Sequence, residues 1–181
     1  MLSIFVTNLG RYNEGDLIGE WLVLPCTTDM LEGLLHRIGI NKNYEEWFII
    51  DYSCNLDCVC KAISEFSSIE ALNCLAERLE EMEYWELKKL EAVAECEGDM
   101  GTNSLLNLTY SLDCFNLYSQ VNTHEELGKY FFYELSAIEI PEHLIRYFDF
   151  EAYGRNIYYD LYGTFTSYGY VEQVDDVVDS L

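Results

Sequence analysis

The chain has 181 residues, of which 33 are Asp or Glu and 10 are Lys or Arg, so its formal net charge is -23. So acidic a surface repels a phosphate backbone, which excludes direct nucleic-acid binding and favours partners with basic surfaces, including those that normally hold DNA. Half of the residues are hydrophobic and 15% are aromatic, which excludes disorder and leaves enough apolar material for one ordinary core or two or three small ones.

The first 62 residues predict a small α+β domain. Two segments of β-branched and aromatic residues flank a stretch with the composition of a turn, and a capped helix and a compact apolar run follow. The expected elements are strands at residues 3–9 and 18–24, a turn at 10–15, a helix from Thr27 or Thr28 to about Arg37, and a strand at 46–52.

Residues 63–108 predict a central helical domain that is the most acidic part of the chain. After an N-cap at Ser67 or Ser68, apolar residues recur every three or four positions up to Met82, which is typical of an amphipathic helix. The register changes near residues 83–85, so two helices are expected. Between residues 65 and 99 there are eleven acids and three bases. The carboxylates that we expect to face solvent and a partner are Glu65, Glu70, Glu77, Glu80, Glu81, Glu86, Glu91, Glu95 and Asp99.

Residues 109–181 predict a second mixed α+β domain. A weak strand pattern at 112–121 precedes Thr123 and Glu126, which have the spacing of a capping box and open a helix to about Leu135. Pro141 suits the first turn of a further helix through residue 147. The Tyr-rich segment 157–171, interrupted by Gly163 and Gly169, predicts two short strands.

The sequence carries no pattern typical of an enzyme. His36, His124 and His143 are scattered, with no nucleophile elbow or triad spacing around them, and no Gly-rich phosphate loop occurs. Adjacent carboxylates such as Glu80 and Glu81 could act as acid and base, but such pairs arise by chance among 33 acids. We therefore expect a non-enzymatic protein without a cofactor.

Cys54, Cys58 and Cys60, with Asp57 between them, form the best candidate for a metal site, because thiolates bind zinc at close spacing. No second Cys or His pair follows at zinc-finger distance, so the alternative is a set of ordinary half-buried thiols. Seven cysteines are an odd number without framework spacing, which favours reduced thiols in a cytoplasm. No segment approaches the roughly 18 apolar residues of a membrane span.

The acidic helix face has two interpretations. An amphipathic helix must solvate one side, and acids keep a protein soluble. A merely solvated helix, however, usually mixes charges of both signs, whereas acids outnumber bases here by about three to one. Duplex DNA carries about one charge per 1.7 Å, so 23 charges match roughly 39 Å of duplex, which makes imitation of DNA geometrically feasible.

Four blocks of the sequence resemble the ArdA antirestriction proteins of plasmids and conjugative transposons. They are IFVTNLGRYNEG at 4–15 with Gly19, Glu20 and Trp21; YEEWFIIDY at 44–52; FSSI at 66–69; and FEAYGRN at 150–156 with Gly163, Thr164 and Phe165. The first and last blocks are the most specific, and the middle resembles the family mainly in acidity and helix content. The cysteines, residues 103–107 and the tail beyond Tyr170 depart from the family pattern.

The resemblance implies an elongated, curved chain of three small domains that imitates bent B-DNA. Such a protein occupies the DNA groove of a type I restriction-modification enzyme, protects incoming mobile DNA, and dimerises through its carboxy-terminal domain. Aromatic residues that could contribute to that interface are Tyr147, Phe148, Tyr153, Tyr158, Tyr159 and Tyr162.

Two functions of other classes remain open from the residues alone. A generic acidic adaptor would bind a basic protein without reference to DNA shape, and competition with duplex DNA would distinguish it from a mimic. A metal-dependent hydrolase would need carboxylates converging in a pocket, so acids distributed outward would count against it.

Overall fold

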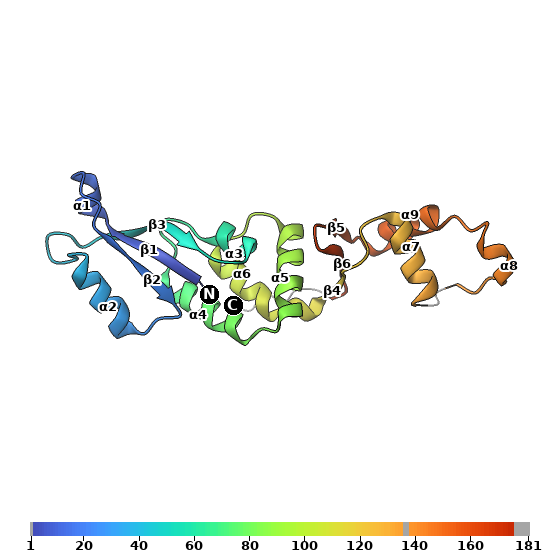
Figure 1. The fold of residues 1–181 in the computed structure, drawn as a ribbon, viewed down its shortest axis with the longest axis horizontal. Coiled ribbons are helices and arrows are strands. Elements are labelled where there is room, and N and C mark those ends of the chain that lie inside the picture. The colour runs from blue at the N-terminus through green and yellow to red at the C-terminus, as the bar shows by residue number, and fades with distance from the viewer. Residues whose placement is uncertain (1, 136–137, 176–181) are drawn as a thin grey trace. The chain divides into compact units, whose positions relative to one another are not determined.

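The computed structural model describes residues 2–135 and 138–175, and they form a mixed α+β structure with two small antiparallel sheets. The chain divides into two compact units (Figure 1). Unit 1 contains the described residues up to Leu87 together with Asp99–Thr109, and unit 2 contains Lys88–Gly98 together with the described residues from Tyr110 onward.

The sheet of unit 1 has the strand order β2-β1-β3. Strands β1 (Leu2–Asn8), β2 (Gly19–Leu24) and β3 (Trp47–Ser53) match the three strands expected from the sequence. Burial alternates along β1 and β2, so that Leu2, Ile4, Val6, Leu22 and Leu24 all point into the core. This alternation fixes which face of the sheet is covered.

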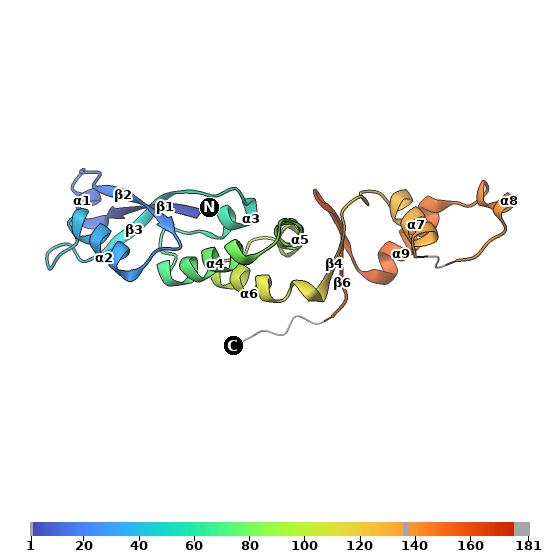
Figure 2. The ribbon, with the colours of Figure 1, turned by 60° about the horizontal axis from the view of Figure 1, so that its bottom comes forward.

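Helices α2 (Thr28–Arg37) and α4 (Ile69–Glu81) both pack against β2 and lie on the same side of the sheet (Figures 1 and 2). Both begin where a hydroxyl caps them: Thr27 accepts a hydrogen bond from the backbone N–H of Met30, and Ser68 accepts one from that of Ala71. The helix over 69–81 confirms the expected periodicity, because its apolar residues are buried at Ile69, Leu72, Leu75 and Ala76.

Three helices of unit 1 were not expected. The segment expected as a turn forms α1 (Leu9–Asn13), because the side chain of Asn8 caps it at the Arg11 N–H. The cysteine-rich segment forms α3 (Asp57–Ala62), and α6 (Thr102–Tyr110) follows the glycine-bounded loop after residue 98. The hydroxyl of Thr102 donates a 3.0 Å hydrogen bond to the carbonyl of Ala62, which joins the two segments.

Helix α5 (Tyr84–Glu97) confirms the second helix of the acidic block, and the division between the two units falls within it, after Leu87. The break between α4 and α5 is at Met82 and Glu83. Here the side chain of Glu86 accepts a 2.8 Å hydrogen bond from the backbone N–H of Glu83, in the manner of a capping box.

Unit 2 contains a sheet of order β4-β6-β5, made of β4 (Phe115–Tyr118), β5 (Thr164–Thr166) and β6 (Gly169–Gln173). The two carboxy-terminal strands are confirmed, but the first begins at Thr164. Residues 157–161, which we expected in a strand, belong instead to α9 (Phe150–Leu161). The strand expected at 112–121 is shorter, because a 3-10 turn occupies Leu112–Cys114.

Helices α7 (His124–Tyr133) and α9 pack closely in unit 2. A Cβ atom on Gly154 would collide with the backbone of His124, and one on Gly128 would collide with the backbone of Phe150. Thr123 caps α7 as expected, and Pro141 is the N-cap of the short α8 (Glu142–Ile145) rather than a residue of its first turn.

The expected division into domains at 1–62, 63–108 and 109–181 is not confirmed by the two units. Helix α4 shares unit 1 with the first sheet, and the side chain of Asn73 exchanges 3.0 Å hydrogen bonds with the backbone N–H and carbonyl of Cys26. Unit 2 takes Lys88–Gly98 from the expected central domain, in addition to the described residues from Tyr110 onward. Across the described part of the chain, every helix is too short or too polar to span a bilayer.

Candidate partner-binding surface

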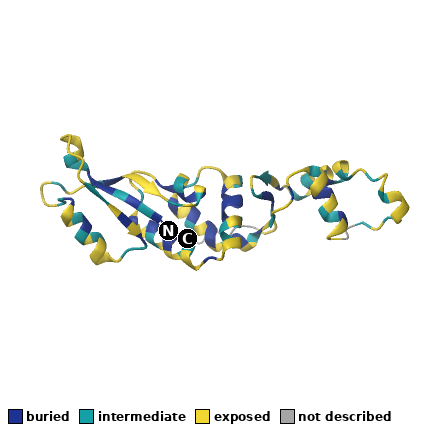
Figure 3. Cartoon of the chain, viewed as in Figure 1, coloured by how far each residue is buried: buried dark blue, intermediate teal, exposed yellow. Residues whose placement is uncertain are grey.

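Carboxylates cover the surface of both units. Of the 31 Asp and Glu residues among those described, 27 are exposed, and Figure 3 shows exposed positions along the helices of each unit. Burying an acid without a partner costs free energy, so acids are expected at exposed positions of any fold. This cost does not explain why the chain has so many of them.

The outer face of α4 presents a row of acids at helical spacing. Glu70, Glu77 and Glu81 are exposed, while the opposite face packs in the core. Glu77 and Glu81 are one turn apart, about 6 Å along the axis. The only base on α4, Arg78, lies 3.8 Å from the carboxylate of Glu81. Most of this face therefore carries uncompensated negative charge.

Six of the nine expected carboxylates are exposed without being tied to a neighbouring strand or helix cap. They are Glu65, Glu70, Glu77, Glu80, Glu81 and Asp99. Glu91 departs from the expectation of a solvent-facing acid, because it is buried to 7% exposure among the apolar residues of α5. Helix α5 buries five consecutive residues, Leu90 to Ala94. The side of the helix that was expected to face solvent is therefore covered at Glu91.

Two further expected carboxylates support local structure. The half-buried Glu86 caps α5 through the Glu83 N–H. Glu95 is exposed, but its carboxylate accepts hydrogen bonds from the backbone N–H of Ser167, at 3.0 and 3.2 Å, and from the Ser167 hydroxyl, at 2.6 Å. Within unit 2 it fastens α5 to the turn between β5 and β6.

Among the described residues, exposed acids outside the block 65–99 number 18, against nine inside it. The sequence interpretation expected acids of the other domains to extend the row but did not name them individually. Exposed acids in the rest of unit 1 are Glu14, Asp16, Asp29, Glu32, Glu45, Glu46, Asp51 and Asp57, and those in unit 2 include Glu125, Glu126, Glu134, Glu142, Glu151 and Asp160. Overall composition was the signal that pointed to them.

At least five of the ten bases are held in local ion pairs. Arg37 binds Glu20 through two hydrogen bonds of 2.8 and 2.9 Å, which lower the pKa of Glu20 and raise that of Arg37. Four further ion pairs are Arg11–Glu14, Arg78–Glu81, Lys129–Glu125 and Arg155–Glu151. Such pairing leaves the excess of acid unchanged.

The candidate metal and catalytic residues are not gathered into a site. Cys58 is buried, and the thiol of Cys60 lies 3.7 Å from the carbonyl oxygen of Cys54. Among residues 2–135 and 138–175, no three His, Cys, Asp or Glu side chains converge to hold a metal ion. His124 packs edge-on against Tyr158 and Phe165, while His36 and His143 are exposed.

The six aromatic residues suggested for a dimer interface divide into two groups. Tyr147, Tyr159 and Tyr162 are exposed, with Tyr162 at 91%. The other three, Phe148, Tyr153 and Tyr158, are half-buried in aromatic contacts inside unit 2. Only the first group could contribute a large area to a second copy of the chain.

Comparison with known proteins identifies the family. The model of the antirestriction protein (ArdA) family matches residues 4–172, nearly the whole chain, and confirms the resemblance. A search of curated proteins found no match. The matched span includes the strands, the acidic helices and the carboxy-terminal sheet described above. The chain belongs to the ArdA family of antirestriction proteins.

Proposed function

We propose that this antirestriction protein imitates B-DNA and occludes the DNA-binding groove of a type I restriction-modification enzyme, thereby protecting incoming mobile DNA. One observation carries the proposal: exposed carboxylates cover both units, and the bases of the chain cannot neutralise them. A groove lined with Lys and Arg to hold phosphates would attract such a surface.

The charge balance indicates that this acidic surface does more than keep the protein soluble. Even if each of the ten bases neutralised one acid, 23 of the 33 acids would remain. Self-repulsion of this size destabilises a compact state, so a sequence selected only for stability would mix charges. The repulsion becomes favourable once a basic surface covers it.

The acids of α4 are the part of this surface with the most regular spacing. Glu70, Glu77 and Glu81 project from one rigid helix whose other side is fixed in the core. Because the helix backbone is already fixed, the entropy lost on binding is mainly that of the glutamate side chains, which favours recognition by a groove that is itself preorganised. No catalytic group, cofactor or metal is required for occlusion.

A competition experiment tests the proposal. A type I methyltransferase bound to a labelled duplex is titrated with the protein at several salt concentrations. We expect displacement of the duplex with an affinity that falls steeply as salt increases, because the contacts are between charges. The enzyme should bind either the protein or the duplex, and no complex that contains both should form.

A matched pair of variants identifies the role of the acids. The triple variant E70Q/E77Q/E81Q should bind roughly three- to hundredfold more weakly at low salt, at ~0.2–1 kcal/mol per exposed charge pair, with a smaller salt dependence. The variant E70D/E77D/E81D keeps the charge and should lose much less. DNA binding that is unaffected by a large excess of the protein at low salt would refute occlusion.

The same experiment separates the adaptor function. An acidic adaptor would bind the enzyme or another basic protein without displacing the duplex, giving a ternary complex. We expect the protein to act in the cytoplasm and as a homodimer, with Tyr147, Tyr159 and Tyr162 exposed for an interface. A dimer would double the charge offered to the groove.

A further inference from the structure

The sheet of unit 1 has an outer face that α2 and α4 do not cover. Its residues alternate with the buried ones along β2 and the first part of β1, and register places them in rows across β2, β1 and β3. Val23, Ser3 and Ser53 form one row, and Trp21, Phe5 and Asp51 form the next. Trp21 and Val23 are each 46% exposed.

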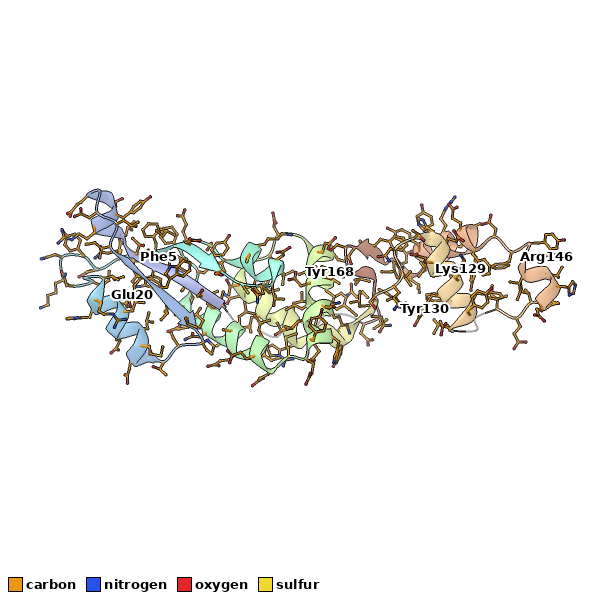
Figure 4. All side chains as sticks on the ribbon, viewed as in Figure 1. Phe5, Glu20, Lys129, Tyr130, Arg146 and Tyr168 are labelled. Carbon is orange, nitrogen blue, oxygen red and sulfur yellow. The ribbon has the colours of Figure 1, made fainter. Side chains whose placement is uncertain are left out.

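The row Trp21–Phe5–Asp51 combines two aromatic rings and a carboxylate. Phe5 pairs with Trp21 on one side and with Asp51 on the other, so each of these two side chains stands about 5 Å from Phe5. Trp21 and Asp51 are two strands apart, about 10 Å, with Phe5 between them. The rings of Phe5 and Trp21 meet edge to face, with centroids 5.4 Å apart (Figure 4 labels Phe5). Asp51 is exposed, and none of the ion pairs found among the described residues includes it.

Local packing holds this row in place. The ring of Phe5 lies against Gly19, where a Cβ atom would come within 2.5 Å of it. Beyond the row, Phe48 lies opposite Thr7 and packs edge-on against Tyr12, which is 49% exposed. The outer face is therefore an aromatic surface on a rigid sheet, with a carboxylate in its centre row.

The chain already contains an arginine bound by groups of the same kind. The guanidinium of Arg11 lies 4.5 Å from the ring centroid of Tyr44 and 3.2 Å from the carboxylate of Glu14. The Tyr44 hydroxyl donates to the same carboxylate at 2.9 Å, which raises the pKa of Tyr44. An aromatic face beside a carboxylate therefore already binds an arginine side chain within this protein.

We propose that the row Trp21–Phe5–Asp51 binds an arginine side chain of the partner's DNA-binding surface, with the guanidinium on the Phe5 ring, between the indole of Trp21 and the carboxylate of Asp51. This rests on the proposed function and names the chemistry of one contact. Arginine fits better than lysine, because its planar guanidinium stacks on an aromatic ring and pairs with a carboxylate at the same time. The Asp51 carboxylate accepts a 2.8 Å hydrogen bond from the backbone N–H of Tyr52, but a purely apolar partner would desolvate it without supplying an opposite charge.

A direct test uses hexa-arginine and hexa-lysine peptides of equal charge with the full chain. The three tryptophans give three indole N–H signals in ¹H–¹⁵N spectra, and the signal missing from Trp21→Phe belongs to Trp21. We expect the arginine peptide to shift the Trp21 signal more than the lysine peptide does, and Asp51→Asn to abolish the difference. Equal shifts from both peptides, or none, would overturn the proposal.

A second test measures affinity for the type I methyltransferase across a salt series. Trp21→Leu removes the larger of the two rings without changing charge, so binding should weaken by about three- to thirtyfold, as expected for a cation–π contact, with an unchanged salt slope. Trp21→Phe keeps a ring and should retain most of the affinity. Asp29 is an exposed acid at the start of α2, and Asp29→Asn is the control for the loss of one charge in Asp51→Asn.

The outcomes distinguish this inference from the function on which it rests. If the wild-type protein displaces DNA but Trp21→Leu binds as tightly as wild type, the arginine site is wrong and occlusion stands. If the wild-type protein does not displace DNA, occlusion fails, and the peptide spectra alone decide on the arginine site. Thermal unfolding of each variant confirms that unit 1 remains folded.

Discussion

The carboxylate of Glu95 receives both the backbone N–H and the hydroxyl of Ser167, although the side chain lies at the surface. Hydrogen bonds to an ionised group are among the stronger ones in proteins, and here they join residues 72 positions apart. Glu95 therefore serves the fold of unit 2 as well as the surface charge. Exposure alone does not identify which acids are free to meet a partner.

Replacing Glu95 should destabilise unit 2. We expect Glu95→Ala to lower its unfolding free energy by about 1–2 kcal/mol, because the turn between β5 and β6 loses its link to α5. Glu97→Ala removes an equally exposed acid two positions away and should change stability by less than about 0.5 kcal/mol. Hydrogen exchange of residues 164–173 provides the measurement, and equal protection in the two variants would contradict the assigned role.

At the level of elements, the sequence predicted those that carry a cap and a clear apolar period. Helix α4 begins after Ser68 and α7 after Thr123, each where a hydroxyl was expected to cap it. Helix α9 was missed although Phe150, Tyr153, Ile157 and Leu161 follow helical spacing, because so many tyrosines suggested strands. Close packing of α9 against α7, where Gly154 meets Gly128, decides in favour of the helix.

The candidate surface was predictable in kind but not residue by residue. Net charge and the acidic face of α4 are properties of the sequence, and the structure places Glu70, Glu77 and Glu81 as expected. The burial of Glu91 depends on packing around α5, which helical periodicity within one segment cannot show. The row across β2, β1 and β3 depends on strand register, which a bulge between Phe5 and Val6 shifts along β3.

The sheet of unit 2 buries tyrosines whose protonation should control its stability at high pH. Burial raises the pKa of Tyr170 from 10.0 to about 12, and burial together with a 2.7 Å hydrogen bond to Glu172 raises that of Tyr118. In the unfolded chain both groups lose their protons near pH 10. Their contribution to stability is therefore complete below pH 10 and is lost as the pH rises through about 12.

Unit 2 should accordingly unfold on alkaline titration before its buried tyrosines ionise. Eleven of the 15 tyrosines lie in unit 2, so near-UV circular dichroism of tyrosine and tyrosinate absorbance report mainly this unit. All three tryptophans lie in unit 1 and report it separately by fluorescence. Tyr118→Phe should make the stability of unit 2 less dependent on pH above 10. Tyr162→Phe removes an exposed tyrosine and should leave that dependence unchanged. Ionisation of Tyr118 near pH 10 in a folded unit would contradict the argument.

At the scale of the whole molecule, charge acts on folding and on binding with opposite signs. The excess of 23 acids repels itself in the free protein, and that repulsion is released when basic groups approach. Salt screens both effects, since the screening length falls from about 30 Å at 0.01 M to about 10 Å at 0.1 M. Added salt should therefore stabilise the fold while it weakens the complex.

We expect the melting temperature to rise by a few degrees between 0.01 and 0.1 M sodium chloride, as about 1 kcal/mol of relieved repulsion would produce in a chain of this size. Over the same range, affinity for a type I methyltransferase should decrease. The variant E70Q/E77Q/E81Q should show a smaller salt effect in both measurements, because it carries three fewer negative charges, while E70D/E77D/E81D should behave like wild type. A melting temperature that falls with salt would mean that local ion pairs such as Arg37–Glu20 outweigh the net repulsion. The charge excess would then not destabilise the free protein, and the inference that it is maintained for a partner would fail.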